Sequence, residues 1–200
     1  VQATMLREEF IDLLLQYIQT KDLLVATTGK TSRELFELRQ RRGEPQRDFL
    51  VVGGMGHASS IALGLALARP ERKVYCLDGD GAMLMHLGAL PVIGGRCRPE
   101  NLVYIVLNNG VHESVGGQPN SVKFLDLPRL ASACSFKHYL RVSDSENAHD
   151  AFVELEKLVG PVFVEALVRP GARKNLGRPT RTPVQNKLDL MRYLNAEDID

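Results

Sequence analysis

The sequence lacks any excess of positive charge. Its 25 Lys and Arg residues are balanced by 24 Asp and Glu residues, and the formal net charge is +1. Nucleic acids and acidic membrane surfaces are bound by clustered cations that release counterions, and this composition offers no such excess. It therefore argues against both kinds of partner. The only basic block is Arg39–Arg42, which we expect to form the solvated end of a helix, where cations suit the helix dipole.

Cysteines are few, and long hydrophobic runs are missing. Cys76, Cys97 and Cys134 are odd in number and far apart, which argues against a disulfide framework or a zinc knuckle. We therefore expect a reducing, cytoplasmic setting. The longest strongly apolar stretch, Ile61–Ala68, is far too short to span a bilayer. The opening residues, Val1–Met5, do not resemble a signal peptide.

Apolar, strand-like runs alternate with helical patterns along the chain. The expected strands are 23–27, 48–52, 73–77, 102–107, 137–141 and 161–168. The expected helices are 4–20, 31–42, 57–68, 81–94, 125–133, 146–158 and 184–194. Thr31–Glu34 reads as a capping box, Pro91 as a kink or break, and 108–120 as a long Gly-rich loop. The alternation indicates an α/β fold with a doubly wound, mostly parallel sheet and helices on both faces.

The turn Gly79-Asp80-Gly81 lies between an expected strand and an expected helix. Glycines allow the backbone to approach a phosphate closely, and a helix N-terminus offers free N–H groups to an anion. Asp80 adds a hard oxygen of the kind that Mg²⁺ prefers. Taken alone, this tripeptide is also compatible with a plain strand-to-helix turn.

Asn108-Asn109 follows the next expected strand, 102–107. The carboxyl ends of parallel strands meet at one edge of a sheet, so an amide oxygen is expected beside Asp80. A carboxylate, an amide and a carbonyl, completed by water and phosphate oxygens, form a ligand set for Mg²⁺. The pair of motifs therefore predicts a magnesium–diphosphate site.

Together these motifs resemble those of the thiamine-diphosphate enzymes, whose diphosphate domain carries Gly-Asp-Gly and then Asn-Asn. The resemblance implies a single diphosphate-binding domain over residues 1–200, with a helix within 1–20 and a tail and helix within 170–200. It implies that Asp80, the side chain of Asn109 and the backbone carbonyl of Val111 bind Mg²⁺. The implied cofactor-binding residues are Gly29, Lys30, Thr31, Gly53, Gly54, Met55, Gly79, Asp80, Gly81, Ala82, Asn109 and Val111.

Met55 lies in the turn Gly53-Gly54-Met55-Gly56, after the second expected strand. The family places a bulky apolar residue at this position, where it props the two rings of the cofactor into a bent conformation. The carbonyl of Gly53 is then implied to accept a hydrogen bond from the 4′-amino group. A core methionine is the alternative interpretation of Met55.

Segments 27–35, 54–60 and 108–119 resemble more narrowly the C-terminal half of the phosphonopyruvate decarboxylases. This implies decarboxylation of 3-phosphonopyruvate to phosphonoacetaldehyde and CO₂ in phosphonate biosynthesis, with the cofactor as electron sink. The β subunit of sulfopyruvate decarboxylase is the nearest alternative.

The implied catalytic residues are Met55, His57, His112 and Glu113. Lys30 and Arg33 join the two histidines in expected loops at the ligand edge, where cations would meet an anionic substrate. A solvated Arg33, ordinary loop histidines, and a Glu113 that only holds its loop remain alternatives.

A pyrimidine domain, which in this family supplies an activating glutamate, does not fit within 200 residues. We therefore expect a hetero-oligomer with a pyrimidine-domain chain or subunit, without which the chain is inactive. The chain is then one subunit of a split enzyme or the C-terminal part of a longer one. Further alternatives are a 2-oxoacid oxidoreductase β-type subunit, whose usual cysteine sets do not fit here, and a non-catalytic cofactor-binding domain.

Overall fold

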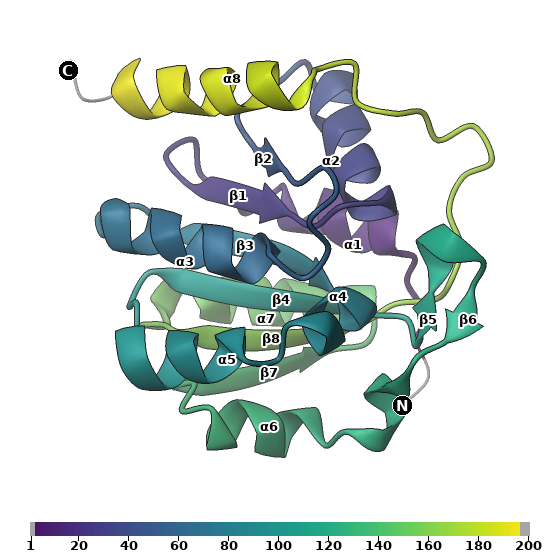
Figure 1. The fold of residues 1–200 in the computed structure, drawn as a ribbon, viewed down its shortest axis with the longest axis vertical. Helices are drawn as coiled ribbons and strands as arrows, with labels where there is room; N and C mark the ends of the chain where they lie inside the picture. The colour runs from purple at the N-terminus through teal and green to yellow at the C-terminus, as the bar shows by residue number, and fades with distance from the viewer. Residues whose placement is uncertain (1–2, 197–200) are drawn as a thin grey trace.

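A six-stranded parallel sheet forms the centre of the protein (Figure 1). The computed structural model describes residues 3–196. The strand order is β2-β1-β3-β4-β8-β7, and every neighbouring pair in this sheet is parallel. The strands are β1 (Leu23–Ala26), β2 (Phe49–Leu50), β3 (Val74–Gly79), β4 (Leu102–Asn108), β7 (His138–Val142) and β8 (Val162–Leu167). The expected doubly wound α/β fold is confirmed.

Helices cover both faces of this sheet. One face carries α1 (Arg7–Leu14), α2 (Lys30–Arg41) and α7 (Ser145–Lys157). The other carries α3 (Ala58–Ala68), α4 (Asp80–Met85), α5 (Ala89–Pro91), the π-helical η1 (Val92–Cys97), α6 (Leu127–Ala133) and α8 (Pro183–Ala196).

The central strands are apolar on both faces because each face packs against helices. In β4, Val103, Ile105 and Leu107 belong to the cluster beneath α1, α2 and α7. The alternate residues, including Tyr104 and Val106, belong to the cluster beneath α3 and α6. Side chains of a strand alternate between faces, so a strand buried on both faces reads as a continuous apolar run. This is why the sequence pattern located the central strands well.

The capping box expected at Thr31–Glu34 is wrong. The helix α2 begins at Lys30, and Gly29 at its N-cap supplies no side-chain cap. Ser32 donates instead to the carbonyl oxygens of Ala26 and Thr27. Glu34 accepts two hydrogen bonds from Arg7 of α1, so tertiary contacts replaced the local cap.

Two expected helices are shorter than the patterns indicated. The first helix ends at Leu14, because the N–H groups of Gln16 and Tyr17 reach back only three residues and tighten the turn. The helix expected over 81–94 is divided before Pro91, between Met85 and Ala89. Pro91 lies in the first turn of α5, where its missing N–H costs nothing.

The expected loop at 108–120 contains regular structure. A small antiparallel hairpin pairs β5 (Val111–His112) with β6 (Gln118–Pro119), with the 3₁₀ turn η2 (Glu113–Val115) between them. A second 3₁₀ turn, η3 (Ser121–Phe124), follows. Such short strands carry no alternation that a sequence pattern can reveal. The hairpin stands beside the carboxyl ends of the central strands (Figure 1).

The solvated helix end expected at Arg39–Arg42 is wrong for Arg39. Its side chain is 1% exposed and binds Asp48 in two places, with Nε–Oδ2 at 2.8 Å and Nη2–Oδ1 at 3.0 Å. Arg42, near the same end of α2, is partly exposed and pairs with Asp12. Burial of Arg39 fixes α2 to the segment that leads into β2. Within residues 3–196, no helix is both long and apolar enough to cross a membrane.

Candidate active site

A cavity lies at the carboxyl edge of the sheet, where β1, β3 and β4 end. Its walls combine the start of α2, the turn between β3 and α4, the segment that follows β4, and one residue of α1. The lining residues are Arg7, Thr27, Thr28, Lys30, Thr31, Met55, Gly79, Asp80, Gly81, Ala82, Leu107, Asn109, Val111, His112, Glu113, Ser114 and Val115. Segments that are far apart in the sequence therefore share one cavity.

Asp80 joins the two turns that the motifs predicted to meet. Its side chain is almost fully buried. One carboxylate oxygen accepts a hydrogen bond from the Gly81 N–H at 2.7 Å, and the other accepts from the Gly110 N–H at 2.6 Å. Gly110 directly follows Asn109, so Asp80 ties the end of β3 to the end of β4.

Asn109 and Val111 lie in the same wall. The Asn109 side-chain oxygen accepts a hydrogen bond from the Val111 N–H at 3.1 Å, and its amide nitrogen donates to Glu113 at 2.9 Å. These contacts fix the orientation of the Asn109 amide. The three residues assigned to a metal, Asp80, Asn109 and Val111, therefore line one cavity.

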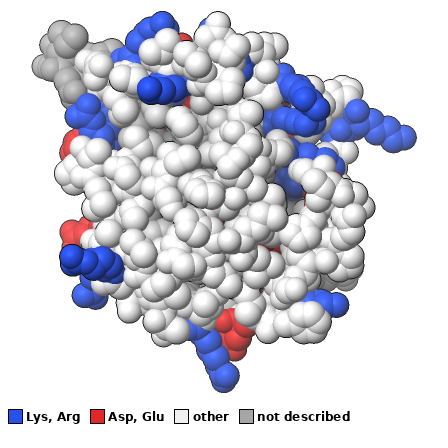
Figure 2. All heavy atoms as spheres, in the orientation of Figure 1, with Lys and Arg blue, Asp and Glu red and all other residues white. Residues whose placement is uncertain are grey.

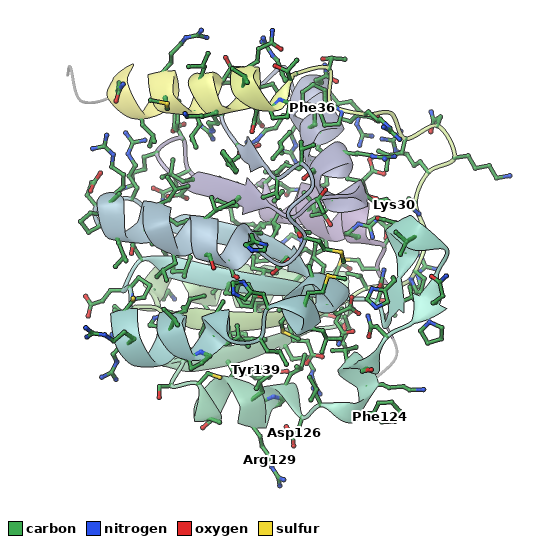
Figure 3. The ribbon with its side chains drawn as sticks, in the orientation of Figure 1. Lys30, Phe36, Phe124, Asp126, Arg129 and Tyr139 are labelled. Atoms are coloured by element: carbon green, nitrogen blue, oxygen red, sulfur yellow. The ribbon has the colours of Figure 1, made fainter. Side chains whose placement is uncertain are left out.

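Glu113 is the most heavily hydrogen-bonded side chain of the cavity. Its Oε2 accepts from Arg7 at 2.7 Å and from Asn109, while its Oε1 accepts from Lys30 at 2.8 Å and from the Gly171 N–H at 3.0 Å. Figure 3 shows Lys30 at the start of α2, next to the β5–β6 hairpin. These contacts favour the interpretation that Glu113 holds its loop.

The pKa of Glu113 lies below its ordinary value. Burial acts to raise this pKa, but the hydrogen bonds and charges of Lys30 and Arg7 outweigh the burial. Glu113 therefore stays ionised at neutral pH and acts as a fixed negative charge.

Arg7 is a residue of the site that the sequence analysis missed. Its guanidinium binds Glu34 through Nε at 2.6 Å and Nη2 at 2.7 Å, and its remaining nitrogen reaches Glu113. Burial raises the pKa of Glu34, against the lowering effect of Arg7. One signal was available: Arg7, Phe10 and Leu14 are spaced to lie on the same buried face of α1.

The Gly53–Gly56 turn brings Met55 to the cavity. Met55 lines the wall and is 37% exposed. Gly56 has a φ of 89°, and a Cβ placed there would lie 3.1 Å from the Ala82 carbonyl oxygen. A larger residue at 56 would therefore push this turn away from α4 and move Met55.

The imidazole of His112 lies over the Gly-Asp-Gly turn. A Cβ placed on Gly81 would come within 2.6 Å of the His112 Nδ1 atom. The glycine at 81 thus allows His112 to approach the turn closely. His57, by contrast, is exposed and outside the cavity lining; its ring lies 5.1 Å from that of His86, between ring centres.

The fully buried carboxyl of Asp78 supports the Gly79-Asp80-Gly81 turn. Asp78 accepts hydrogen bonds from the Tyr104 hydroxyl and from the Gly79 N–H, both at 2.9 Å. Burial raises the pKa of Asp78 and also that of Tyr104. Asp78 therefore fixes the start of the turn that carries Asp80.

Most of the expected site residues converge on the cavity. Those that line it are Lys30, Thr31, Met55, Gly79, Asp80, Gly81, Ala82, Asn109, Val111, His112 and Glu113. Those outside its lining are Gly29, Gly53, Gly54 and His57. Besides Arg7, the analysis did not assign Thr27, Thr28, Leu107, Ser114 and Val115, which also line the cavity.

The donor chemistry of the cavity fits magnesium and a diphosphate. Among the described residues, no group of three or more His, Cys, Asp or Glu side chains is arranged to hold a metal ion. The assigned set contains one carboxylate, Asp80, with an amide and a carbonyl oxygen. Such a set leaves several positions for phosphate oxygens and water, as Mg²⁺ prefers. A Cβ placed on Gly79 would meet no atom of residues 3–196 within 4 Å, so this turn leaves room beside its backbone.

Comparison with known proteins gives consistent results. The model of the family "Thiamine pyrophosphate enzyme, C-terminal TPP binding domain" matches residues 27–166. A phosphonopyruvate decarboxylase of Streptomyces viridochromogenes is 40% identical over 175 residues, which cover 88% of this chain and 43% of that protein. A sulfopyruvate decarboxylase subunit beta of Methanothermobacter thermautotrophicus is 38% identical over 150 residues, which cover 75% of each chain.

The chain thus spans less than half of the phosphonopyruvate decarboxylase that it matches. A solved structure of a putative thiamin diphosphate-dependent enzyme from Mycobacterium smegmatis shares the fold, with a TM-score of 0.66 and 19% identity. That match covers 84% of this chain and 32% of the other.

Proposed function

The chain belongs to the thiamine pyrophosphate enzymes, in the family of their C-terminal TPP-binding domains, and on that premise we propose that it is one half of a 2-oxo acid decarboxylase. Its substrate is 3-phosphonopyruvate, which yields phosphonoacetaldehyde and CO₂ in phosphonate biosynthesis. The cofactors are thiamine diphosphate and Mg²⁺. When bound, thiamine diphosphate supplies the electron sink for the loss of CO₂.

The meeting of Asp80, Asn109 and Val111 in one cavity carries the cofactor part of this proposal. These residues hold Mg²⁺, and the backbone of Gly81 and Ala82 at the start of α4 holds the diphosphate, because a helix N-terminus attracts phosphate. Met55, which also lines the cavity, supports the rings of the cofactor.

The similarity to phosphonopyruvate decarboxylases supports the choice of substrate. The Streptomyces viridochromogenes relative matches more of this chain, at slightly higher identity, than the sulfopyruvate decarboxylase subunit does. Both relatives are decarboxylases by name, which favours decarboxylation over the oxidoreductase alternative. Release of CO₂ from 3-phosphonopyruvate and 3-sulfopyruvate distinguishes the two substrates; a faster reaction with the sulfonate would reverse the assignment.

Calorimetry tests the metal assignment directly. We expect Asp80→Ala to weaken Mg²⁺-dependent binding of thiamine diphosphate by at least about 10- to 100-fold, the loss seen when even an indirect supporter of a metal site is removed. Asp150→Ala is the matched control, because Asp150 is exposed on α7. Unchanged affinity in Asp80→Ala would remove Asp80 from the site. The titration is made both with and without a pyrimidine-domain chain.

A largely uncharged face supports the need for such a partner chain. Residues 49–68 and 81–95 contain no Asp, Glu, Lys or Arg. Figure 2 shows charged side chains around the rim of this face and few near its centre. Leu67 and Met85 are 53% and 60% exposed on it. Apolar patches of this kind mark protein interaction sites, and this one adjoins the Met55 turn.

We infer that the pyrimidine-domain partner covers this uncharged face and completes the site, and that the chain is inactive alone. The name "subunit beta" of the Methanothermobacter thermautotrophicus relative supports a separate partner subunit. Leu67→Glu and Met85→Glu are expected to abolish association in size-exclusion chromatography with light scattering. Val153→Glu is the control, since Val153 is 46% exposed on α7, beneath the opposite face of the sheet. Association that survives both substitutions would place the partner elsewhere.

A further inference from the structure

A second cavity, of about 300 Å³, adjoins the candidate active site at the ends of β1 and β2. We call it the basic cavity. Its polar wall is formed by Thr28, Gly29, Ser32, Arg33, Arg178 and Arg181, and among residues 3–196 no Asp or Glu lines it. Figure 2 shows basic side chains gathered on this side of the molecule, over α2 and the tail that precedes α8.

The arginines of the basic cavity are poorly neutralised. Arg181 lies 3.5 Å from Asp189, a carboxylate that Arg192 also binds. Within residues 3–196, neither Arg33 nor Arg178 forms an ion pair or a side-chain hydrogen bond. The buried arginines Arg7 and Arg39, by contrast, are both held by carboxylates.

The tail is bound to α1 and α2 a few residues before Arg178. Arg173 pairs with Glu8 of α1 at 2.8 Å and also with Glu37 of α2. Glu37 then accepts a hydrogen bond from the Gly177 N–H at 2.7 Å. The position of Arg178 is therefore set by the fold, although its side chain is exposed.

The start of α2 adds to the attraction for an anion. This helix spans Lys30–Arg41, and its N-cap Gly29 makes no side-chain cap. Its first N–H groups and its dipole therefore favour a negative charge near Gly29. Two unpaired arginines and an uncapped helix start point to one ligand chemistry, an oxyanion.

Thr28 connects the basic cavity to the active site, because it lines both cavities. In 3-phosphonopyruvate one methylene group separates the keto carbon from the phosphonate. A site for that phosphonate must therefore adjoin the place where the keto group reacts. The basic cavity adjoins the active-site cavity at Thr28 and carries the required charge.

We propose that the basic cavity binds the tetrahedral oxyanion at the end of the substrate, with Arg33 and Arg178 as its principal cationic partners. This inference rests on the proposed function and names the specificity site of that reaction. A guanidinium presents paired donors that match two oxygens of a phosphonate or sulfonate. A free phosphate ion would be bound by the same groups, so the test must separate the phosphonate of the substrate from free phosphate.

Kinetics of the enzyme reconstituted with its partner chain give the first test. In Arg33→Met and Arg178→Met, the value of kcat/KM for 3-phosphonopyruvate should fall about 10- to 100-fold, as expected for loss of a charge-assisted hydrogen bond. The fall should come mainly from KM, while calorimetric affinity for thiamine diphosphate stays within about twofold. Arg33→Lys should recover part of the loss, since it keeps the charge without the fork. Arg129→Met is the control, because the Arg129 side chain is 88% exposed at the far edge (Figure 3).

Methylphosphonate and inorganic phosphate identify the source of the oxyanion. Competitive inhibition by methylphosphonate against 3-phosphonopyruvate, weakened in Arg33→Met, supports the proposal. Noncompetitive inhibition by phosphate that disappears in Arg33→Met, with KM unchanged, would overturn it in favour of a regulatory site. Unchanged kcat/KM in both arginine variants would also overturn it. If the wild type releases no CO₂, the proposed function fails. Calorimetric binding of methylphosphonate to the wild type that is lost in Arg33→Met would still support the basic cavity as an oxyanion site. Equal binding to both proteins would refute that site.

Discussion

Glu113 is the point at which four segments of the chain meet, so its replacement by glutamine tests how the site is held together. Its carboxylate accepts four hydrogen bonds, two on each oxygen, from Arg7, Asn109, Lys30 and the Gly171 N–H. Glutamine has the same shape but carries one acceptor oxygen and two donors. In either orientation its NH₂ group faces two donors, and both of those hydrogen bonds are lost.

The cost follows from the exposure of each partner. The cheaper orientation turns the NH₂ group toward Lys30, whose side chain is 28% exposed and can be hydrated at a cost of about 0–1 kcal/mol. The Gly171 N–H loses a hydrogen bond worth about 1 kcal/mol. Arg7 keeps its two bonds to Glu34 but loses its second anion, which costs about 1 kcal/mol more. We therefore expect Glu113→Gln to lower the free energy of unfolding by about 2 kcal/mol.

Urea unfolding at pH 7 measures this loss. Glu100→Gln is the matched control, because Glu100 also pairs with a lysine, Lys137 at 3.2 Å, but is 76% exposed. Its effect should stay within about 0.5 kcal/mol, as for most exposed pairs. Equal effects of the two substitutions would refute the view that the Glu113 network is worth more than a surface pair.

The pH dependence of Glu113→Gln gives an independent check. Because the folded pKa of Glu113 is lowered, its contribution to stability is complete above the ordinary value of 4.5 and is lost as the pH falls through the lowered pKa. The difference between wild type and Glu113→Gln should be full at pH 7 and shrink below about pH 4.5. A difference that grows on acidification would contradict the assignment of a lowered pKa.

Two further pairs of substitutions compare a buried position with an exposed one nearby. Arg39→Ala leaves the buried Asp48 without its cation and should lower the free energy of unfolding by about 3–5 kcal/mol. Arg42→Ala removes a partly exposed pair and should lower it by about 0–1 kcal/mol. Equal losses of the two variants in urea unfolding would contradict this difference. Gly94→Ala places a Cβ 2.1 Å from the backbone oxygen of Cys134 and should cost at least about 1–3 kcal/mol, as overpacking does. In Gly95→Ala the added Cβ has no neighbour within 4 Å in the described part of the chain, so the melting temperature should stay nearly unchanged. Similar melting temperatures for both alanine variants would show that η1 can shift freely.

The central strands were predictable because their signal is local. The strands β1, β3 and β4 are buried on both faces, so each consists largely of a continuous apolar run, and in the equally buried β8 only Glu165 interrupts the run. The strand β2 was expected over 48–52 but spans only Phe49–Leu50, because pairing with β1 decides its length. The hairpin of β5 and β6 escaped prediction because two-residue strands have no periodicity.

The sequence also predicted that the two central residues of the candidate site lie together. Asp80 and Asn109 each follow an apolar strand, and parallel strands deliver their carboxyl ends to one edge. Nothing beyond the order of the elements was needed to bring these two side chains together.

Tertiary structure alone decided which residues surround Asp80 and Asn109. Arg7 meets Glu113 across 106 residues of chain. The tail that carries Arg178 is held against α2 by Arg173, which binds Glu37. Such contacts depend on how helices and tail pack against the sheet, and no local pattern encodes that. The chain itself thus determined the sheet and the paired motifs, whereas packing determined which charges hold the site and which remain free for a ligand.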